Sequence, residues 1–106
     1  MSERILVTGS TDGIGLETAL TLARRGHQVI LHGRNAKKLE AATAELKKVS
    51  ATAALTPELG DLGSLADVRR LAASILKRTD GPTVLLNNAG VFMDGAGTTV
   101  AATNAM

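Results

Sequence analysis

The sequence predicts an α/β fold, a single domain in which four parallel strands in the order 3-2-1-4 carry helices on both faces. Short β-like runs alternate with helical stretches along the 106 residues, which is typical of βαβ units and a parallel sheet. A chain of this length suits one domain with one core. Right-handed crossovers then fix the strand order, with the first two helices on one face and the third, joined by any final helix, on the other.

The first three elements follow from apolar spacing. Residues 4–8 read as a strand, and residues 13–25 as a helix whose apolar positions recur at helical spacing. Gly26 ends that helix, because glycine accepts the left-handed conformation common just past a helix end. Residues 28–32 read as the second strand.

Capping residues and a proline place the next elements. Asn35 caps a helix that runs to about Val49 with one apolar face. Residues 53–60 are the expected third strand. Because Pro57 cannot donate to a sheet ladder, we expect this strand at an edge of the sheet.

The last elements begin with a third helix, for which Ser64 followed by Asp67 resembles a capping box. We expect its apolar positions to face a core: Leu65, Val68, Leu71, Ala72, Ile75 and Leu76. The turn at 79–82 leads to a fourth strand at 83–87, which is apolar on both sides, as a central parallel strand should be. Residues 98–106 are expected to form a short final helix.

Composition narrows the function classes. The chain is 44% hydrophobic and 21% charged, and no apolar run approaches the roughly 20 residues that span a bilayer. The start, Met1 to Arg4, leaves no room for a signal peptide, so we expect a cytoplasmic protein without a membrane partner. With no cysteine and two histidines, a metal site is not expected. A net charge of +2 without stacking aromatics argues against nucleic-acid binding.

A glycine-rich turn follows the first strand, in the stretch "TGSTDGIG" at residues 8–15. Glycine lets the backbone turn sharply and approach a ligand, while the first-turn amides of the helix point outward at the positive end of its dipole. This pattern predicts a pyrophosphate site. The alternative is that the glycines serve only a tight strand-to-helix turn.

The spacing of these glycines resembles the short-chain dehydrogenase/reductase family. Its dinucleotide motif, T-G-x-x-x-G-x-G, is matched by Thr8, Gly9, Gly13 and Gly15. Its N-N-A-G motif is matched by Asn87, Asn88, Ala89 and Gly90. Sequences of the retinol-dehydrogenase-like branch of the family are similar to this chain at the stretches "TGSTDGIGLETA", "HGRN" and "DL". The resemblance implies a Rossmann-type domain and covers the whole of this chain, but only the front half of the family's domain.

The resemblance also implies roles for single residues. The N-N-A-G segment would line the adenosine-ribose side of the cofactor, Asp61 would hydrogen-bond the adenine amino group, and Leu62 would pack against the ring. The predicted cofactor-binding residues are Gly9, Ser10, Thr11, Gly13, Ile14, Gly15, Arg34, Asn35, Asp61, Leu62, Asn88, Ala89 and Gly90.

The stretch "HGRN" at residues 32–35 predicts the choice of cofactor. An NAD site usually places a carboxylate after the second strand, where it binds the ribose 2′-hydroxyl and would repel a 2′-phosphate. Gly33 offers no carboxylate, whereas Arg34 supplies a planar fork suited to phosphate. We therefore expect NADP(H) to be preferred over NAD(H). The alternative is that Arg34 is a solvated loop residue.

Two neighbouring residues receive plainer interpretations. Asp12 would repel a phosphate if it pointed inward, so we expect it to cap the first helix and face solvent. His32 is read as a strand-end residue rather than a catalytic base.

Catalysis in the resembled family uses a Ser and a Y-x-x-x-K pair, with an upstream Asn. This sequence contains no tyrosine, and Asn104 occupies the place of the upstream Asn. We therefore expect residues 1–106 to be a dinucleotide-binding domain that lacks the catalytic half and is inactive alone. Three functions stay open for the chain: the NADP-binding half of a reductase, a non-enzymatic NADP-binding or interaction module, and one half of a split enzyme. A homodimer through the edge of the fourth strand is a further expectation.

Overall fold

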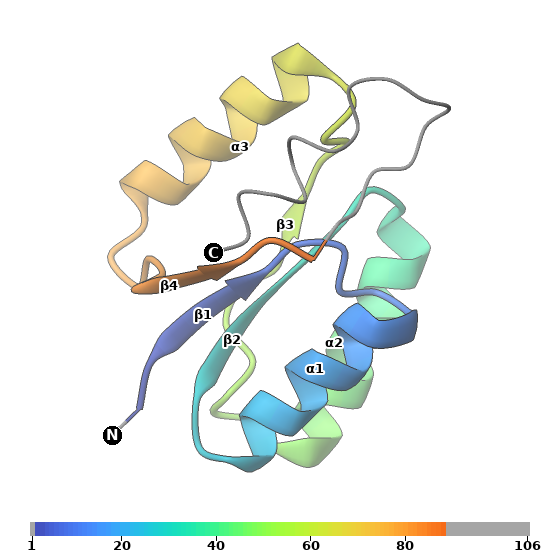
Figure 1. Cartoon of the computed structure of the whole chain (residues 1–106), viewed down its shortest axis with the longest axis vertical. Helices are drawn as coiled ribbons and strands as arrows, with labels where there is room; N and C mark the ends of the chain where they lie inside the picture. Colours follow the sequence, from blue (N-terminus) through green and yellow to red (C-terminus); the bar gives the residue numbers. More distant parts are fainter. Residues whose placement is uncertain (1, 89–106) are drawn as a thin grey trace.

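The computed structural model describes residues 2–88. It contains, in order, β1 (Arg4–Val7), α1 (Gly13–Arg24), β2 (Gln28–Gly33), α2 (Ala36–Val49), β3 (Glu58–Leu59), α3 (Leu65–Lys77) and β4 (Val84–Leu86). All strand pairs are parallel and the order is β3-β2-β1-β4, which confirms the predicted topology (Figure 1). The expected final helix at 98–106 lies outside the described residues, as do Ala89, Gly90 and Asn104.

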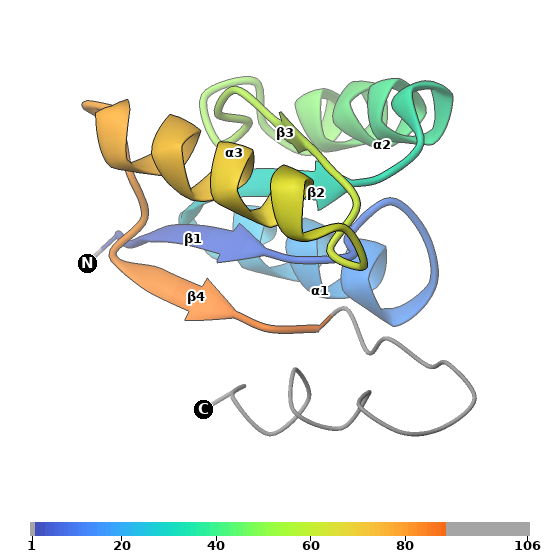
Figure 2. The ribbon, with the colours of Figure 1, turned by 90° about the horizontal axis from the view of Figure 1, so that it is seen from above.

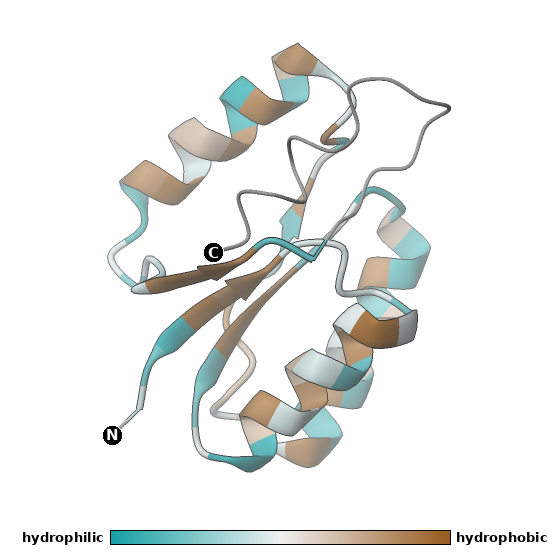
Figure 3. Ribbon diagram, viewed as in Figure 1, coloured by the Kyte–Doolittle hydropathy of each residue, from teal (hydrophilic) through white to brown (hydrophobic). Residues whose placement is uncertain are grey.

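The sheet lies between α3 on one side and α1 with α2 on the other (Figures 1 and 2). The core between the sheet and the α1–α2 layer is formed by alternate strand residues and by the apolar stripes of both helices (Figure 3). Its members include Val7, Ala19, Val29, Leu31 and Leu46, each 1% exposed or less. Burial of this face therefore fixes the register of the two central strands.

The third strand is shorter than the predicted 53–60. Residue Ala54 bridges Val29, and regular pairing of β3 with β2 resumes only at Glu58. Pro57 stands between the two, and proline has no N–H to donate to a ladder. The predicted strand is therefore interrupted there, while its edge position is confirmed.

The expected burial of the α3 face was wrong for most of its residues. Only Leu71 of this face is buried, at 7% exposed, whereas Leu65 and Leu76 are 65% and 85% exposed. In β4, Val84 and Leu85 are 37% and 53% exposed, so this strand is not covered as a central strand would be. Among the residues that the structure describes, β4 pairs only with β1 and no further strand lies outside it.

A buried ion pair fastens the end of α3 to β3. One Nη of Arg78 donates to Glu58 at 2.7 Å and to the Thr56 carbonyl at 2.8 Å. The same guanidinium donates to both carboxylate oxygens of Asp80, at 3.0 and 3.1 Å. The side chains of Arg78 and Glu58 are each 9% exposed. This polar network attaches the end of α3 to the sheet, and Leu71 is the one buried apolar residue of the helix.

Helices long and apolar enough to cross a bilayer do not occur within residues 2–88.

Candidate functional site

The candidate site lies at the carboxyl edge of the sheet, where the turns after the parallel strands meet. In open α/β sheets this edge, beside the point where the strand order reverses, is where ligands bind. Here β1 lies between β2 and β4, so the turn that follows β1 is at that reversal. The turn carries the predicted glycine motif.

Three glycines give that turn its shape. Gly9 and Gly13 have φ of 61° and 57°, the left-handed region that other residues adopt at a cost. Gly15 is buried because α1 approaches the turn closely: a Cβ there would collide with the carbonyl oxygen of Gly9 and lie 2.6 Å from Nδ2 of Asn88. Gly9 and Gly13 are therefore required by backbone conformation and Gly15 by close packing.

The start of α1 carries no side-chain cap and no acidic residue in its first turn. The first helical hydrogen bond runs from the Leu16 N–H to the Asp12 carbonyl, so the preceding amides make no bond of this kind. By contrast, Asn35 caps α2 and Ser64 caps α3 through their side-chain oxygens. The amides at the positive end of α1 thus have no side-chain cap, and Ile14 beside them is 79% exposed.

The capping role expected of Asp12 was wrong in one respect. Asp12 occupies the cap position and is exposed, but its side chain makes no capping hydrogen bond. Its carboxylate instead accepts from Nζ of Lys38 at 3.3 Å. Since Lys38 lies in the first turns of α2, this exposed pair links the glycine turn to the turn after β2.

The turn after β2 brings a cation without a carboxylate. Arg34 and Lys37 are exposed, and Asn35 accepts from the Lys38 N–H at 3.0 Å. Gly33 is buried against Thr11, and a Cβ on Gly33 would collide with the Thr11 methyl group. The glycine turn and the second turn therefore pack directly against each other.

The turn after β3 is held by two carboxylates. Asp61 accepts from the Gly63 N–H, and Asp67 accepts from the Asp61 N–H, both at 2.8 Å. The hydrogen bond from the Asp61 backbone lowers the pKa of Asp67, with a smaller contribution from Arg70. Asp61 is exposed and Leu62 half-buried, so both are accessible in a fixed turn.

The segment after β4 reaches the glycine turn from the other side. Nδ2 of Asn88 donates to the Gly9 carbonyl at 3.2 Å, and the Thr8 hydroxyl donates to Oδ1 of Asn87 at the same distance. The two predicted motifs are thus in contact. Of the predicted residues, Asn88 thus contacts Gly9, and Thr11 contacts Gly33 beside Arg34, whereas Ser10 is fully buried and bonded to the β2 backbone.

The residue that sequence reasoning missed is His32. It was expected as a strand-end residue, and it does lie near the end of β2, 5% exposed. In addition, its Nδ1 accepts from the Gly9 N–H and its Nε2 contacts the Gly60 carbonyl, both at 2.9 Å. The signal available in the sequence was a polar ring one residue before a strand end.

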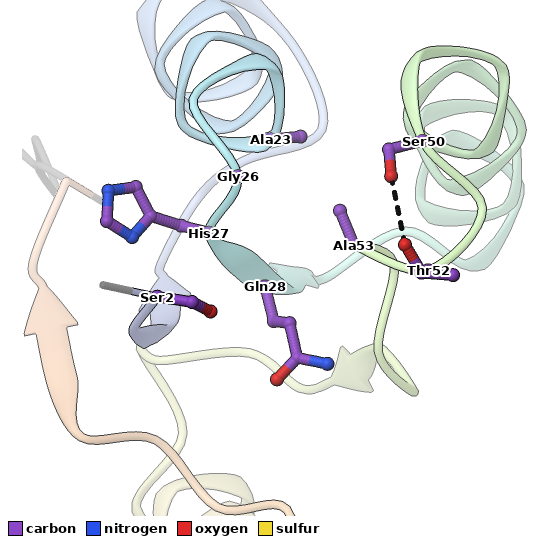
Figure 4. Close-up of a pocket in the computed structure, with 8 residues that line it drawn as sticks. All are labelled: Ser2, Ala23, Gly26, His27, Gln28, Ser50, Thr52 and Ala53. Carbon is purple, nitrogen blue, oxygen red and sulfur yellow. Dashed lines mark hydrogen bonds between the residues drawn. The ribbon is translucent and has the colours of Figure 1, made fainter.

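A separate hollow of about 320 Å³ lies at the opposite end of the sheet (Figure 4). Its lining comes from the start of β2 and from the segments after α1 and α2, including His27, Gln28 and Thr52. The lining residues include no Lys, Arg, Asp or Glu. Within residues 2–88, three or more His, Asp or Glu side chains are nowhere grouped as a metal would require.

Comparison with known proteins agrees with this geometry. The sequence model of the family described as short chain dehydrogenase matches residues 3–105. Human retinol dehydrogenase 13 is 40% identical over 88 residues, which are 83% of this chain and 27% of that protein. The chain therefore spans about a quarter of the length of this relative.

Solved structures give the same match. A short-chain dehydrogenase from Sphingobium yanoikuyae in complex with NADPH superposes with a TM-score of 0.76 at 28% identity, over 97% of this chain and 44% of that one. The L-sorbose reductase of Gluconobacter frateurii, complexed with NADPH and L-sorbose, gives 0.73 at 27% identity over 90% and 36%. Both likenesses cover nearly all of this chain and less than half of the other.

Proposed function

The chain belongs to the short-chain dehydrogenase family, and on that premise we propose that residues 1–106 are the NADP(H)-binding half of an oxidoreductase that interconverts carbonyl compounds and alcohols. When bound, the nicotinamide cofactor would supply the hydride. The residues proposed to hold it are Gly9, Ser10, Thr11, Gly13, Ile14, Gly15, Arg34, Asn35, Asp61, Leu62 and Asn88, together with Ala89 and Gly90 outside the described residues. Asn104, also outside them, is proposed separately as the counterpart of the family's upstream Asn.

The observation that carries the proposal is the start of α1. Its outward amides have no side-chain cap, and the only carboxylate of the turn, Asp12, is held by Lys38. Glycines with positive φ bring this backbone to the surface without side chains in the way. A diphosphate supplies the negative charge that such a helix start favours. The buried Ser10 is proposed to contribute by fixing the turn.

NADP(H) is proposed over NAD(H) because of the turn after β2. The exposed guanidinium of Arg34 suits a 2′-phosphate, and exposed Lys37 adds positive charge. A carboxylate at position 33, as an NAD site would use, needs a Cβ where the Thr11 methyl group lies. NADPH in the two structural neighbours gives further support.

The Arg34→Gln variant tests this preference. A charge-assisted hydrogen bond contributes about 1.5–3 kcal/mol, so its loss should weaken NADP⁺ binding by about 10- to 150-fold. Affinity for NAD⁺ should change little, because NAD⁺ lacks the 2′-phosphate. Isothermal titration calorimetry with each dinucleotide measures both.

The matched control is Arg24→Gln, an exposed arginine in the last turn of α1, at the far end of that helix from the glycine turn. It removes the same charge and should leave both affinities unchanged. Equal losses for NADP⁺ and NAD⁺ in Arg34→Gln, or equal losses in the two variants, would contradict a 2′-phosphate contact.

Catalysis is proposed to need residues that this sequence does not contain. In the family a tyrosine passes the proton and a lysine lowers its pKa, and the 106 residues include no tyrosine. A purified polypeptide of these residues should therefore leave NADPH absorbance unchanged with carbonyl substrates. Steady NADPH consumption that is proportional to protein concentration would refute this.

The exposed α3 and β4 surface favours the reading in which more protein completes the site. Leu65, Leu76 and Leu85 of these elements are each more than half exposed, and exposed large apolar side chains can mark contact surfaces. A covalently continuous or separately supplied catalytic half would cover such a surface. The homodimer through the β4 edge stays a prediction of the same kind.

A further inference from the structure

Two turns of the proposed site are joined through one imidazole ring. Nδ1 of His32 accepts a hydrogen bond from the Gly9 N–H, in the turn after β1. Nε2 of the same ring lies 2.9 Å from the carbonyl oxygen of Gly60, in the turn after β3. The ring therefore spans from the glycine motif to the turn that carries Asp61.

The backbone of His32 adds a second attachment to the glycine turn. The Ser10 N–H donates to the His32 carbonyl at 2.9 Å, and the His32 N–H donates to the Ser10 hydroxyl at 2.9 Å. Both residues are buried, at 5% and 0% exposed. These two bonds attach Ser10 to β2, whereas the ring holds the amide of Gly9.

The two ring contacts require one protonation state. A backbone N–H can only donate, so Nδ1 must hold a lone pair toward Gly9. A carbonyl oxygen can only accept, so Nε2 must carry the proton toward Gly60. A second proton on Nδ1 would place two N–H groups against each other, and the Gly9 amide would lose its buried acceptor.

Resting on the proposed function, we propose that His32 is a positioning residue of the dinucleotide site, whose neutral ring with its proton on Nε2 holds Gly9 in place and whose protonation releases that turn and weakens cofactor binding. The ring touches no cofactor atom in this proposal. It acts through the backbone of Gly9, which has the positive φ that starts the motif.

The charged groups around the ring set the direction of its titration. Burial lowers the pKa of His32, and the Gly60 carbonyl and the Glu58 carboxylate oppose this less strongly. Glu58, opposite His32 in the β3 pairing, is itself paired with Arg78. Other charges on the neighbouring turns and helix starts include Asp12, paired with Lys38, the exposed Arg34, Lys37 and Asp61, and Asp67 of α3, paired with Arg70.

The lowered pKa has a consequence for stability. Between the ordinary histidine value of about 6.5 and the lower folded value, the unfolded chain binds more protons than the folded chain. The free energy of unfolding should therefore fall as the pH drops through this window and should be fully retained above it. In the folded chain the ring takes its second proton only around the lower, folded pKa, so release of Gly9 belongs to the acidic end of this window.

Imidazole ¹⁵N NMR on the chain without cofactor tests the holding contact. We expect the Nε2–H form of His32 at about pH 7.5, and a Gly9 amide signal that moves with the His32 titration as the pH is lowered. His27 is the matched control, because its Nδ1 also accepts a backbone N–H, from Glu3 at 3.1 Å, but at the opposite end of the sheet (Figure 4). A proton on Nδ1 of His32, or a Gly9 signal that ignores its titration, would overturn the proposal.

Binding of NADP⁺ tests the functional consequence. In His32→Asn the amide oxygen replaces Nδ1 as acceptor and does not titrate, so this variant should bind nearly as well as the parent chain at about pH 7.5. The 2′-phosphate of NADP⁺ itself titrates near pH 6 and affects both proteins equally. The ratio of the dissociation constants of the parent and His32→Asn at one pH therefore reports the effect of the His32 ring alone. When the pH is lowered from about 7.5 through the His32 titration that NMR locates, the parent should weaken about three- to tenfold relative to His32→Asn, the equivalent of one hydrogen bond.

Two further comparisons distinguish failure of the His32 role from failure of the proposed cofactor binding. His27→Asn should keep the same ratio to the parent throughout this pH range. A constant ratio between the parent and His32→Asn would overturn the positioning role. If no variant binds NADP⁺ at any pH, the proposed function fails and the role of His32 in cofactor binding fails with it, while the Gly9 signal still shows whether the ring holds the turn.

Discussion

Gly15→Ala should reduce NADP⁺ affinity by on the order of 100-fold or more, the loss expected when two charge-assisted contacts of about 1.5–3 kcal/mol each are misplaced. The added Cβ would collide with the Gly9 carbonyl oxygen and lie 2.6 Å from Nδ2 of Asn88. Because backbone is in the way, the turn itself must move. Overpacking of this kind also costs about 1–3 kcal/mol of folding free energy. Calorimetric titration and urea unfolding measure the two effects.

The control for this variant is Gly81→Ala. A Cβ at Gly81 would meet its nearest atoms at 3.6 Å, an ordinary contact, and its φ lies outside the left-handed region. Affinity and stability should both stay within error of the parent. If Gly15→Ala binds NADP⁺ like the parent, close approach of α1 to the turn is not needed for the site.

Arg78→Met should lower the free energy of unfolding by about 3–5 kcal/mol, the range seen when one partner of a buried ion pair is removed. Glu58, with its side chain 9% exposed, would keep its charge without the guanidinium that neutralises it. The Thr56 carbonyl and the Asp80 carboxylate would lose the same donor group. Urea unfolding followed by circular dichroism gives the difference.

The double variant Arg78→Met with Glu58→Met provides the check. Replacing both charges by apolar groups of similar size is often neutral, so most of the lost stability should return. If the single variant is unfolded in buffer, the return of cooperative unfolding in the double variant carries the test. A loss below about 1 kcal/mol in the single variant would mean that the pair behaves like an exposed one.

Much of the fold could be predicted because it rests on local periodicity. The helix predicted at residues 13–25 ends one residue earlier in the structure. The predicted caps Asn35 and Ser64 both begin their helices as expected. Strand order followed from the right-handed crossover rule. Pro57 also explains why the third strand is interrupted, although the sequence did not predict how short the strand would be.

The contacts of single side chains were the part that the sequence could not supply. Asp12 had a clear local role as a cap, but Lys38, 26 positions later, takes its carboxylate. From the sequence, His32 could be placed only at the end of a strand, because its hydrogen-bond partners Gly9 and Gly60 lie 23 and 28 positions away. The apolar face of α3 fits the helical period, yet periodicity does not say what covers a face, and most of this one is exposed.

The most direct test is equilibrium binding of NADP⁺ and NAD⁺ to the 106-residue chain by isothermal titration calorimetry. We predict saturable binding of NADP⁺ at one site, tighter than that of NAD⁺, because the glycine turn takes the diphosphate and Arg34 the 2′-phosphate. No saturable heat with NADP⁺ at millimolar concentration would contradict it.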